Sequence, residues 1–349
     1  MAFKVTTADG GKVVRNWGYQ LQGEEEDREP QPLNAKALAK VPHDLIVIDF
    51  SKDGSGDGAF SEKQIANLKK RKKANSVIVS YISIGEVSDY RDHWQDGWTK
   101  WTDEDQKCAG ELTDKAPAWL GAWNESWPNS RKVRYWDPGW QNIIFNDEGT
   151  GWLDQIVAAG FDGVFLDRVD AFSGVADERP TGRAEMIDFV KAIATYARKL
   201  KPGFAIVPQN GEDLLLEPSY LATIDGIAKE DLLFGHPNEG QPNSPAEVAV
   251  AAGKLTLAVR AGLPVLAVEY VLAKEKTDML RADLTARGFK PYFGVRTLDR
   301  LILPEDLKPA VALAAAAAAA KNAAGAVKRG HAPRQAKAKT KAQVKNGKR

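Results

Sequence analysis

Acidic side chains stand at or just after the ends of several short apolar runs along the chain. They are Asp49, Glu86, Asp167 with Asp170, Glu230 with Asp231, and Glu269, and the amides Gln209 and Asn210 end another run. A single acid at such a position commonly caps a helix or joins a buried ion pair. Acids from five strands that end at one edge of a parallel sheet instead predict a shared, carboxylate-lined site.

Hydrolysis of a glycosidic bond is the chemistry that such a site serves best. One carboxylic acid protonates the departing oxygen, and a second carboxylate attacks the anomeric carbon or activates a water molecule. Crowding of several carboxylates also raises the pKa of at least one, which keeps a proton available at neutral pH. We take Asp167 and Glu230 as the preferred catalytic pair.

Histidine and cysteine chemistry is poorly supplied. The chain has four histidines, none at the end of an apolar run, and its single cysteine, Cys108, is interpreted as a small buried thiol. A metal-dependent hydrolase could use Asp49, Asp167 and Glu269 as ligands, but such sites usually include histidine. The Gly-rich nucleotide motifs GxGxxG and GxxxxGK[ST] are absent. We therefore expect no metal and no cofactor.

Tryptophan is concentrated in one part of the chain. Nine of the ten tryptophans lie between Trp94 and Trp152, and the tenth is Trp17. The flat faces of sugar rings pack on aromatic faces, so these indoles are candidates for sugar subsites. The alternative is that these rings form a local core within the Trp-rich segment over residues 94–152, which we call the excursion. We expect about half of the rings to form that core and the others to line subsites.

The elements that must position these residues are eight apolar runs that alternate with helix-length amphipathic segments. The runs cover residues 13–19, 44–50, 76–85, 162–170, 204–210, 225–231, 264–270 and 291–296. This alternation is typical of βα units around a parallel sheet. A doubly wound sheet is the alternative, but no Gly-rich phosphate fingerprint follows the first run. We predict an α/β fold of the (β/α)₈ TIM-barrel type, with the Trp-rich segment inserted after the third strand.

The C-terminal segment differs in composition from the rest of the chain. Residues 321–349 hold ten Lys or Arg and no acid, which leaves 38 basic and 47 acidic residues in the remainder. We predict one domain over residues 1–307, followed by an Ala-rich segment and a disordered Lys-rich tail over 308–349. A basic tail of this kind is suited to contact an anionic surface or nucleic acid, and the expected role is one of these contacts.

Membrane insertion and export are not indicated by this sequence. No run of about 18 apolar residues is present that would span a bilayer. The first residues, MAFKVTTADGGKVVRNWGY, contain no apolar stretch of signal-peptide length. We expect a protein with no membrane span, and the compartment stays open.

Four blocks of the sequence carry a specific resemblance. DLIVIDFSKDG, VIVSYISIGEVSDYRDHW, KVRYWDPGWQ and GFDGVFLDRVDAF resemble glycoside hydrolase family 114 and its endo-α-1,4-polygalactosaminidase relatives. The resemblance covers residues 13–300 and implies that Asp167 is the nucleophile and Glu230 the acid/base. It also implies hydrolysis of α-1,4-linked galactosamine polymers with retention, and a secreted or cell-surface location.

We expect a polysaccharide or oligosaccharide as the partner of the site. The acidic body would attract a cationic, de-acetylated glycan. A non-catalytic carbohydrate-binding barrel is the main alternative, since it would need the tryptophans but not both Asp167 and Glu230. The predicted substrate-binding residues are Trp17, Tyr19, Asp49, Tyr81, Glu86, Arg134, Trp136, Asp137, Asp170, Asn210 and Glu269.

Overall fold

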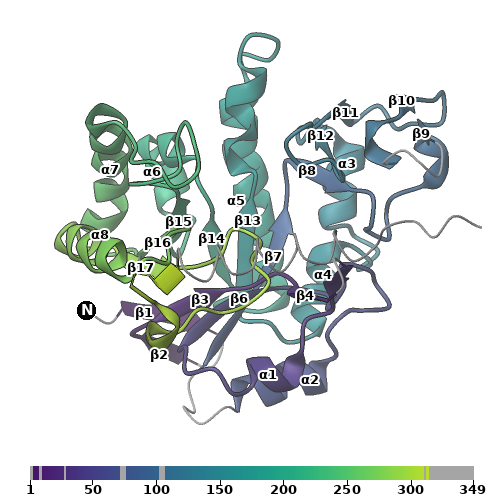
Figure 1. Cartoon of the computed structure of the whole chain (residues 1–349). Coiled ribbons are helices and arrows are strands. Elements are labelled where there is room, and N and C mark those ends of the chain that lie inside the picture. Colours follow the sequence, from purple (N-terminus) through teal and green to yellow (C-terminus); the bar gives the residue numbers. More distant parts are fainter. Residues whose placement is uncertain are drawn as a thin grey trace, which may run out of the picture.

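The structure is a computed structural model that describes residues 3–7, 10–26, 29–70, 76–101, 107–309 and 312–313. It is an α/β fold with a parallel central sheet (Figure 1). The predicted Ala-rich segment and basic tail lie almost entirely outside the described residues. Within those residues, no helix is both long and apolar enough to cross a bilayer.

The central sheet is built from the predicted apolar runs. One part has the order β14-β13-β7-β6-β3 and the other the order β15-β16-β17, with every described pairing between these strands parallel. Nearly continuous apolar sequence suits strands that are covered on both faces. The strands are β3 (Trp17–Tyr19), β6 (Leu45–Asp49), β7 (Val77–Ser83), β13 (Gly163–Asp167), β14 (Ala205–Pro208), β15 (Ile227–Glu230), β16 (Val265–Glu269) and β17 (Lys290–Phe293).

The two parts of the sheet also contact each other at both ends of the strand order. A parallel bridge pairs Gln209 with Ala228, next to the ends of β14 and β15. At the other end of the strand order, the Trp17 indole of β3 donates to the Lys290 carbonyl of β17 at 2.8 Å. A backbone ladder between β3 and β17 is not among the described pairings. Closure of the sheet into a barrel therefore stays a prediction.

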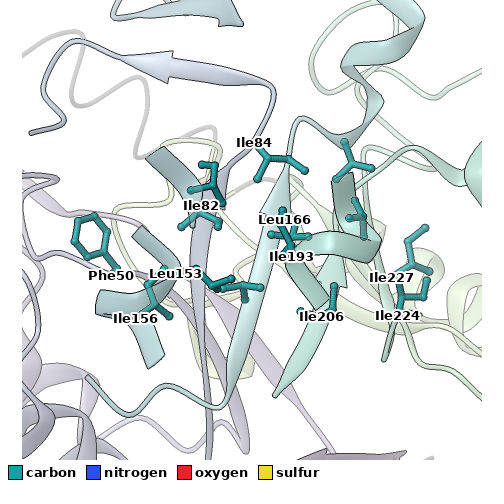
Figure 2. Packing of buried hydrophobic residues seen from close by; sticks show 14 of the residues in the cluster. Phe50, Ile82, Ile84, Leu153, Ile156, Leu166, Ile193, Ile206, Ile224 and Ile227 are labelled. Carbon is teal, nitrogen blue, oxygen red and sulfur yellow. The ribbon is translucent and has the colours of Figure 1, made fainter. Parts of the chain in front are cut away.

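The side chains of the strands form two apolar cores, because neighbouring residues of a strand point to opposite faces. In β6, Ile46 and Ile48 belong to the outer core, whereas Leu45 and Val47 belong to the inner one. Figure 2 shows the outer core, where side chains such as Leu166 of β13 meet Leu153 and Ile193 of the covering helices. The inner core receives side chains from all eight strands.

Helices follow the strands and cover the outer face of the sheet (Figure 1). One helix begins directly after Ser61, whose hydroxyl accepts from Gln64 N in a capping box. The same device begins the helix after Ser244. The helices are α1 (Ala35–Leu38), α2 (Glu62–Lys69), α4 (Trp152–Ala158), α5 (Gly182–Leu200), α6 (Pro218–Leu221), α7 (Pro245–Arg260) and α8 (Lys274–Ala286).

The smaller sheets are antiparallel. The hairpins β1–β2 (Phe3–Thr7, Gly10–Val14) and β4–β5 (Gly23–Glu26, Glu29–Gln31) belong to the N-terminal part of the chain. Between β7 and β13 lie β9–β10 (Thr99–Lys100, Glu111–Leu112) and a sheet of order β11-β12-β8 (Leu120–Trp123, Ser130–Val133, Glu86–Ser88). Helix α3 (Pro138–Ile144) follows them.

Most described indoles of this excursion form a local core. Trp94, Trp98, Trp119 and Trp140 contact one another in sequence, with ring centroids 5.1–5.3 Å apart. All four are buried, and the Trp140 indole donates to the carbonyl of Ile84. These rings stabilise the excursion itself and are not available to a ligand. Trp127 is the exposed exception.

Candidate active site

A cavity of about 740 Å³ opens at the C-terminal ends of the parallel strands. Asp49, Asp167 and Glu230 are the last residues of their strands, and all three line it. Tyr81 near the end of β7 and Gln209 just after β14 complete the floor. Acids from four of the five predicted strands therefore line one cavity, whereas Glu269 of the fifth does not.

One amide connects the two carboxyl groups of the predicted pair. Gln209 Nε2 donates to Asp167 Oδ1 and to Glu230 Oε1, each at 3.1 Å. The two acceptor oxygens are consequently no more than twice that distance apart. Because Gln209 is buried, the amide holds both carboxyl groups at a fixed separation.

Each carboxyl group also receives a tyrosine hydroxyl. Tyr81 donates to Asp167 Oδ2 at 2.7 Å, and Tyr270 donates to Glu230 Oε2 at 3.0 Å. Asn210 Nδ2 adds a further bond to Glu230 Oε1 at 3.0 Å. All four carboxyl oxygens thus accept hydrogen bonds, which fixes the orientation of both groups.

Burial changes the acidity of both groups. It raises the pKa of Asp167 to about 6, and the negative charge of Glu230 acts in the same direction. Burial also raises the pKa of Glu230, against the hydrogen bond from Asn210. Two carboxyl groups held this close do not readily ionise together. The pair is therefore able to retain a proton at pH values where an exposed carboxyl has lost it.

The backbone turns in the same unusual way after three of these strands. Non-glycine residues rarely adopt a positive φ, and such strained positions concentrate at functional sites. Here three of them have φ values of 61°, 60° and 52°. They are Arg168, Asn210 and Asp231, which directly follow Asp167, Gln209 and Glu230. The strained turns thus flank the carboxyl pair and the amide that connects it.

Two further acids of the cavity are held by arginines. Arg91 forms a two-pronged bond with Asp49, at 2.9 and 2.6 Å, and both side chains are buried. Arg168 Nε lies 3.0 Å from Glu86 Oε1. Asp49 is therefore neutralised by its partner and suits a structural role. Glu86 keeps a raised pKa, mainly because it is buried.

Predicted site residues divide between the cavity and other parts of the fold. Among the predicted substrate-binding residues, those that line the cavity are Tyr19, Asp49, Tyr81, Glu86, Asp170 and Asn210. Those that do not are Trp17, Arg134, Trp136, Asp137 and Glu269. These five residues are not part of the proposed site, and each has another role in the fold.

Four of these five residues support the local fold. Trp17 is buried in the inner core at the start of its strand. Arg134 bonds the carbonyls of Ala118 and Leu120 on the exposed side of the excursion. The Trp136 ring lies 4.9 Å from the Arg179 guanidinium, and Asp137 caps helix α3.

Glu269 is fully buried on the outer face of β16. Its carboxylate accepts the backbone N–H groups of Leu233 and Phe234, at 2.9 and 3.1 Å. Both belong to the loop that follows Glu230. Burial raises the pKa of Glu269 to about 7, while these backbone bonds act in the opposite direction. Glu269 therefore anchors a loop next to the cavity.

We expect Glu269→Ala to lower the free energy of unfolding by about 2–4 kcal/mol, because two buried N–H groups lose their acceptor. Urea unfolding measures the change, and exposed Glu178→Ala is the control. If both variants unfold at the same urea concentration, the anchoring role is wrong.

The pH dependence gives a second readout of Glu269. A carboxyl group whose pKa is raised in the folded state stabilises the fold below its unfolded pKa and loses this contribution as pH rises through the folded pKa. For Glu269 this window runs from about 4.5 to about 7. Glu269→Gln, which cannot ionise, should show a flatter dependence of unfolding free energy on pH across that window.

Several site residues were not predicted as such. Tyr270 directly follows Glu269 and contacts Glu230, while the Arg296 guanidinium lies 4.3 Å from the Tyr270 ring and bonds both oxygens of Asp231. Alternation along β16 is the signal that could have identified Tyr270. Arg296 carried no sequence signal, because its role depends on contacts between distant segments.

Potential metal ligands and the single cysteine are the remaining reactive groups among the described residues. No group of three or more His, Cys, Asp or Glu residues among the described positions has an arrangement that would hold a metal ion. Cys108 is buried, and burial raises the pKa of its thiol.

Sequence comparison identifies relatives over most of the chain. Residues 4–307 match the sequence profile described as glycoside-hydrolase family GH114. An uncharacterized protein of Deinococcus radiodurans is 35% identical over 292 residues, which is 83% of each chain. An uncharacterized protein of Methanocaldococcus jannaschii is 37% identical over 304 residues, covering 82% of this chain and 77% of the relative.

Structural comparison identifies a similar fold. The glycoside hydrolase domain of PelA from Pseudomonas aeruginosa superposes with a TM-score of 0.59 at 17% identity. The match covers 83% of this chain and 98% of that domain. At this level of identity the similarity concerns the fold.

Proposed function

Because the chain belongs to glycoside-hydrolase family GH114, we propose that it hydrolyses a polysaccharide with Asp167 and Glu230 as its catalytic carboxyl groups. The observation that carries this proposal is the Gln209 amide that bonds both carboxyl groups at the floor of the large cavity. A two-carboxylate reaction needs such a fixed pair on either side of the scissile bond.

The separation of the pair supports a retaining mechanism. Retaining enzymes hold the carboxyl groups about 5–5.5 Å apart, and inverting enzymes about 6.5–9.5 Å apart. The two oxygens bonded to Gln209 are within twice 3.1 Å of each other. That limit lies below the separation typical of inverting enzymes, whose wider gap accommodates a water molecule. Direct attack by a carboxylate suits this geometry better.

The geometry supports a two-carboxylate reaction, and the family resemblance implies which carboxyl group has which role. Asp167 attacks the anomeric carbon, the bond to the glycosidic oxygen breaks, and Glu230 gives its proton to that oxygen. Glu230 then takes a proton from water, whose oxygen attacks the anomeric carbon and releases Asp167. The hydroxyls of Tyr81 and Tyr270 keep the two carboxyl groups oriented throughout.

An α-1,4-linked galactosamine polymer is the proposed substrate. The family resemblance supports this choice, and so does the excess of acidic over basic residues outside the C-terminal segment. A net negative body attracts a polymer whose free amino groups are protonated. Inside the cavity, Arg91 and Arg168 balance the charges of Asp49 and Glu86. The attraction therefore comes from acidic residues over the surface of the protein as well as from the cavity.

We further propose that the parallel sheet closes into a (β/α)₈ barrel. All eight parallel strands contribute side chains to the inner core, as expected for the interior of a barrel. The bond between Trp17 and Lys290 supports the approach of the first strand to the last. Backbone hydrogen exchange of β3 and β17 would test closure, because paired edge strands are protected from exchange.

A panel of polysaccharides tests the proposed activity. We expect new reducing ends from α-1,4-linked galactosamine polymer, and little release from its fully acetylated form or from neutral polysaccharides. Reducing-end assays and chromatography of the products measure this. Binding of the polymer without any release of fragments would favour a non-catalytic carbohydrate-binding protein. Release from a neutral polysaccharide alone would make the proposed substrate wrong.

A further inference from the structure

Two exposed aromatic side chains line the large cavity at some distance in sequence from the carboxyl pair. The side chains of Tyr90 and Trp127 are 48% and 59% exposed, respectively. Most other described indoles of the excursion are buried or half-buried. An exposed indole and phenol that face one cavity form a surface suited to the flat face of a sugar ring.

The Tyr90 ring is held in place although it is exposed. Gly54 lies so close that a Cβ atom at this position would be 2.6 Å from the ring. On another side, the Arg91 guanidinium lies 5.0 Å from the ring centroid and is itself held by Asp49. A ring fixed in this way loses little conformational freedom when a ligand binds.

Trp127 lies in the connection between β11 and β12, which is joined to the segment that carries Tyr90. Strand β12 pairs with β8 through Ser130 and Ser88, and Asp89 N donates to Asn129 O at 3.0 Å. Tyr90 directly follows Asp89. The two aromatic side chains therefore belong to one wall of the cavity.

This wall is connected to the carboxyl pair through polar contacts. Asn124, in the same connection as Trp127, donates to Glu86 Oε1 at 2.9 Å. Arg168 also contacts that oxygen, and it directly follows Asp167. The aromatic wall thus keeps a defined position relative to Asp167.

A second cavity supports an inference about which side of the scissile bond this wall would occupy. A space of about 560 Å³ is lined by Glu230, by Asp231 and by Val250 of α7, but not by Asp167. A general acid stands on the side of the departing group, so the departing part of a chain extends past Glu230 toward this second cavity. In Figure 1, α7 and the β11–β12 hairpin lie on opposite sides of the molecule. The part of the polysaccharide that stays attached to Asp167 would therefore extend toward the β11–β12 hairpin.

We propose that Trp127 and Tyr90 form a subsite for the glycone part of a polysaccharide, the part that becomes attached to Asp167. This inference rests on the proposed glycosidase function. The sugar ring stacks on the aromatic faces, and the neighbouring polar groups of Ser88, Asn129 and Ser130, which also line the cavity, supply hydrogen-bond partners for its substituents. The subsite binds a unit that is remote from the bond being cleaved, and thus governs how long a glycone the enzyme prefers.

Trp127→Ala and Tyr90→Ala test this subsite, with Trp136→Ala as the matched control. Trp136 belongs to the same excursion but contacts Arg179 and does not line the cavity. The substrates are α-1,4-linked galactosamine oligosaccharides of increasing length, labelled at the reducing end. We expect kcat/KM of the two subsite variants to fall on the order of tenfold for long oligosaccharides, mainly through KM, and to change little for the shortest one cleaved. Trp127→Phe should recover part of the loss.

The cleavage position supplies a readout that a folding defect would not change selectively. In the subsite variants, the preference for fragments with a long glycone part should disappear, whereas Trp136→Ala should keep the normal product pattern. Unchanged kinetics and products in both subsite variants would overturn the proposal. So would a loss that depends on the length of the departing part.

Binding measured by calorimetry separates this proposal from the proposed activity. If the unmodified protein binds the oligosaccharides without cleaving them, the glycosidase function is wrong. The subsite then stands if Trp127→Ala weakens binding and Trp136→Ala does not. If the unmodified protein neither binds nor cleaves them, both proposals are wrong.

Discussion

Asp167→Asn is expected to reduce kcat on the cleaved polysaccharide by more than about 10⁴-fold, because the amide cannot attack the anomeric carbon as a carboxylate does. The fold should persist, since asparagine keeps the side-chain volume and can still accept the bond from Tyr81. Activity assays measure the loss, and thermal unfolding verifies that the variant is folded. Calorimetry should show nearly normal substrate affinity.

The matched control is Asp188→Asn, an exposed position on helix α5 whose partner is Lys191. It makes the same chemical change away from the cavity and should retain full activity. Substantial turnover by Asp167→Asn would remove Asp167 as the nucleophile. Loss of substrate binding together with turnover would instead assign Asp167 mainly to binding.

The period of two along a strand explains much of what the sequence predicted correctly. Asp49, Asp167 and Glu230 occupy the same face of their strands as Val47, Phe165 and Ala228 of the inner core. These acids therefore reach the cavity at the strand ends. The eight apolar runs were sufficient to locate the parallel strands, because buried parallel strands are almost continuously apolar.

The prediction for Glu269 did not take the alternation of side chains along its strand into account. It lies two residues after Ala267 of the outer core, whereas Val268 belongs to the inner core. Alternation thus directs Glu269 away from the cavity and Tyr270 toward it. The prediction from residue type chose the carboxylate, although the pattern of the strand favoured its neighbour.

The tryptophans could not be assigned from the sequence alone. Trp119, Trp127 and Trp140 occur in one stretch and have the same residue type. Their environments depend on how the antiparallel sheet of the excursion folds against α3, which brings distant segments together. About half of the rings were expected to form a local core. The structure buries five of the nine rings of the excursion, and of the nine only Trp127 lines the cavity.

The hydrogen bonds that orient the two carboxyl groups also depend on tertiary structure. Gln209 was recognised as a strand-end residue, but its bonds to both Asp167 and Glu230 require three strands in register. The positive φ of Arg168 had no sequence signature, since arginine does not favour this conformation. Aspartate tolerates a positive φ more readily, but nothing in the sequence distinguished Asp231 from the other aspartates. A strained backbone conformation persists only where the contacts of the surrounding structure hold it in place.

Glu230→Gln is the variant that tests the acid/base role most directly. We expect kcat to fall by about 10²–10⁴-fold on natural linkages, which need a proton on the departing oxygen, and the formation of the covalent intermediate to change much less on activated aryl glycosides. In the unmodified protein, activity should be lost as pH falls below about 6, because Asp167 becomes protonated and cannot attack. Activity should also decline at higher pH as Glu230 loses its proton, and Glu230→Gln should lack this second decline. Initial rates across pH on both substrate types measure these effects.

Azide provides the control for the second step, because this small anion attacks the glycosyl–Asp167 intermediate without help from a general base. It should restore turnover of an aryl glycoside by Glu230→Gln and give a glycosyl azide of retained configuration, whereas Asp188→Asn should gain nothing from azide. The first product of the unmodified protein, followed by NMR, should likewise have the configuration of the substrate. A first product of inverted configuration would exclude the covalent route. Equal losses on natural and activated substrates would exclude Glu230 as the proton donor, because only a group that protonates the departing oxygen makes the rate depend on how well that oxygen leaves.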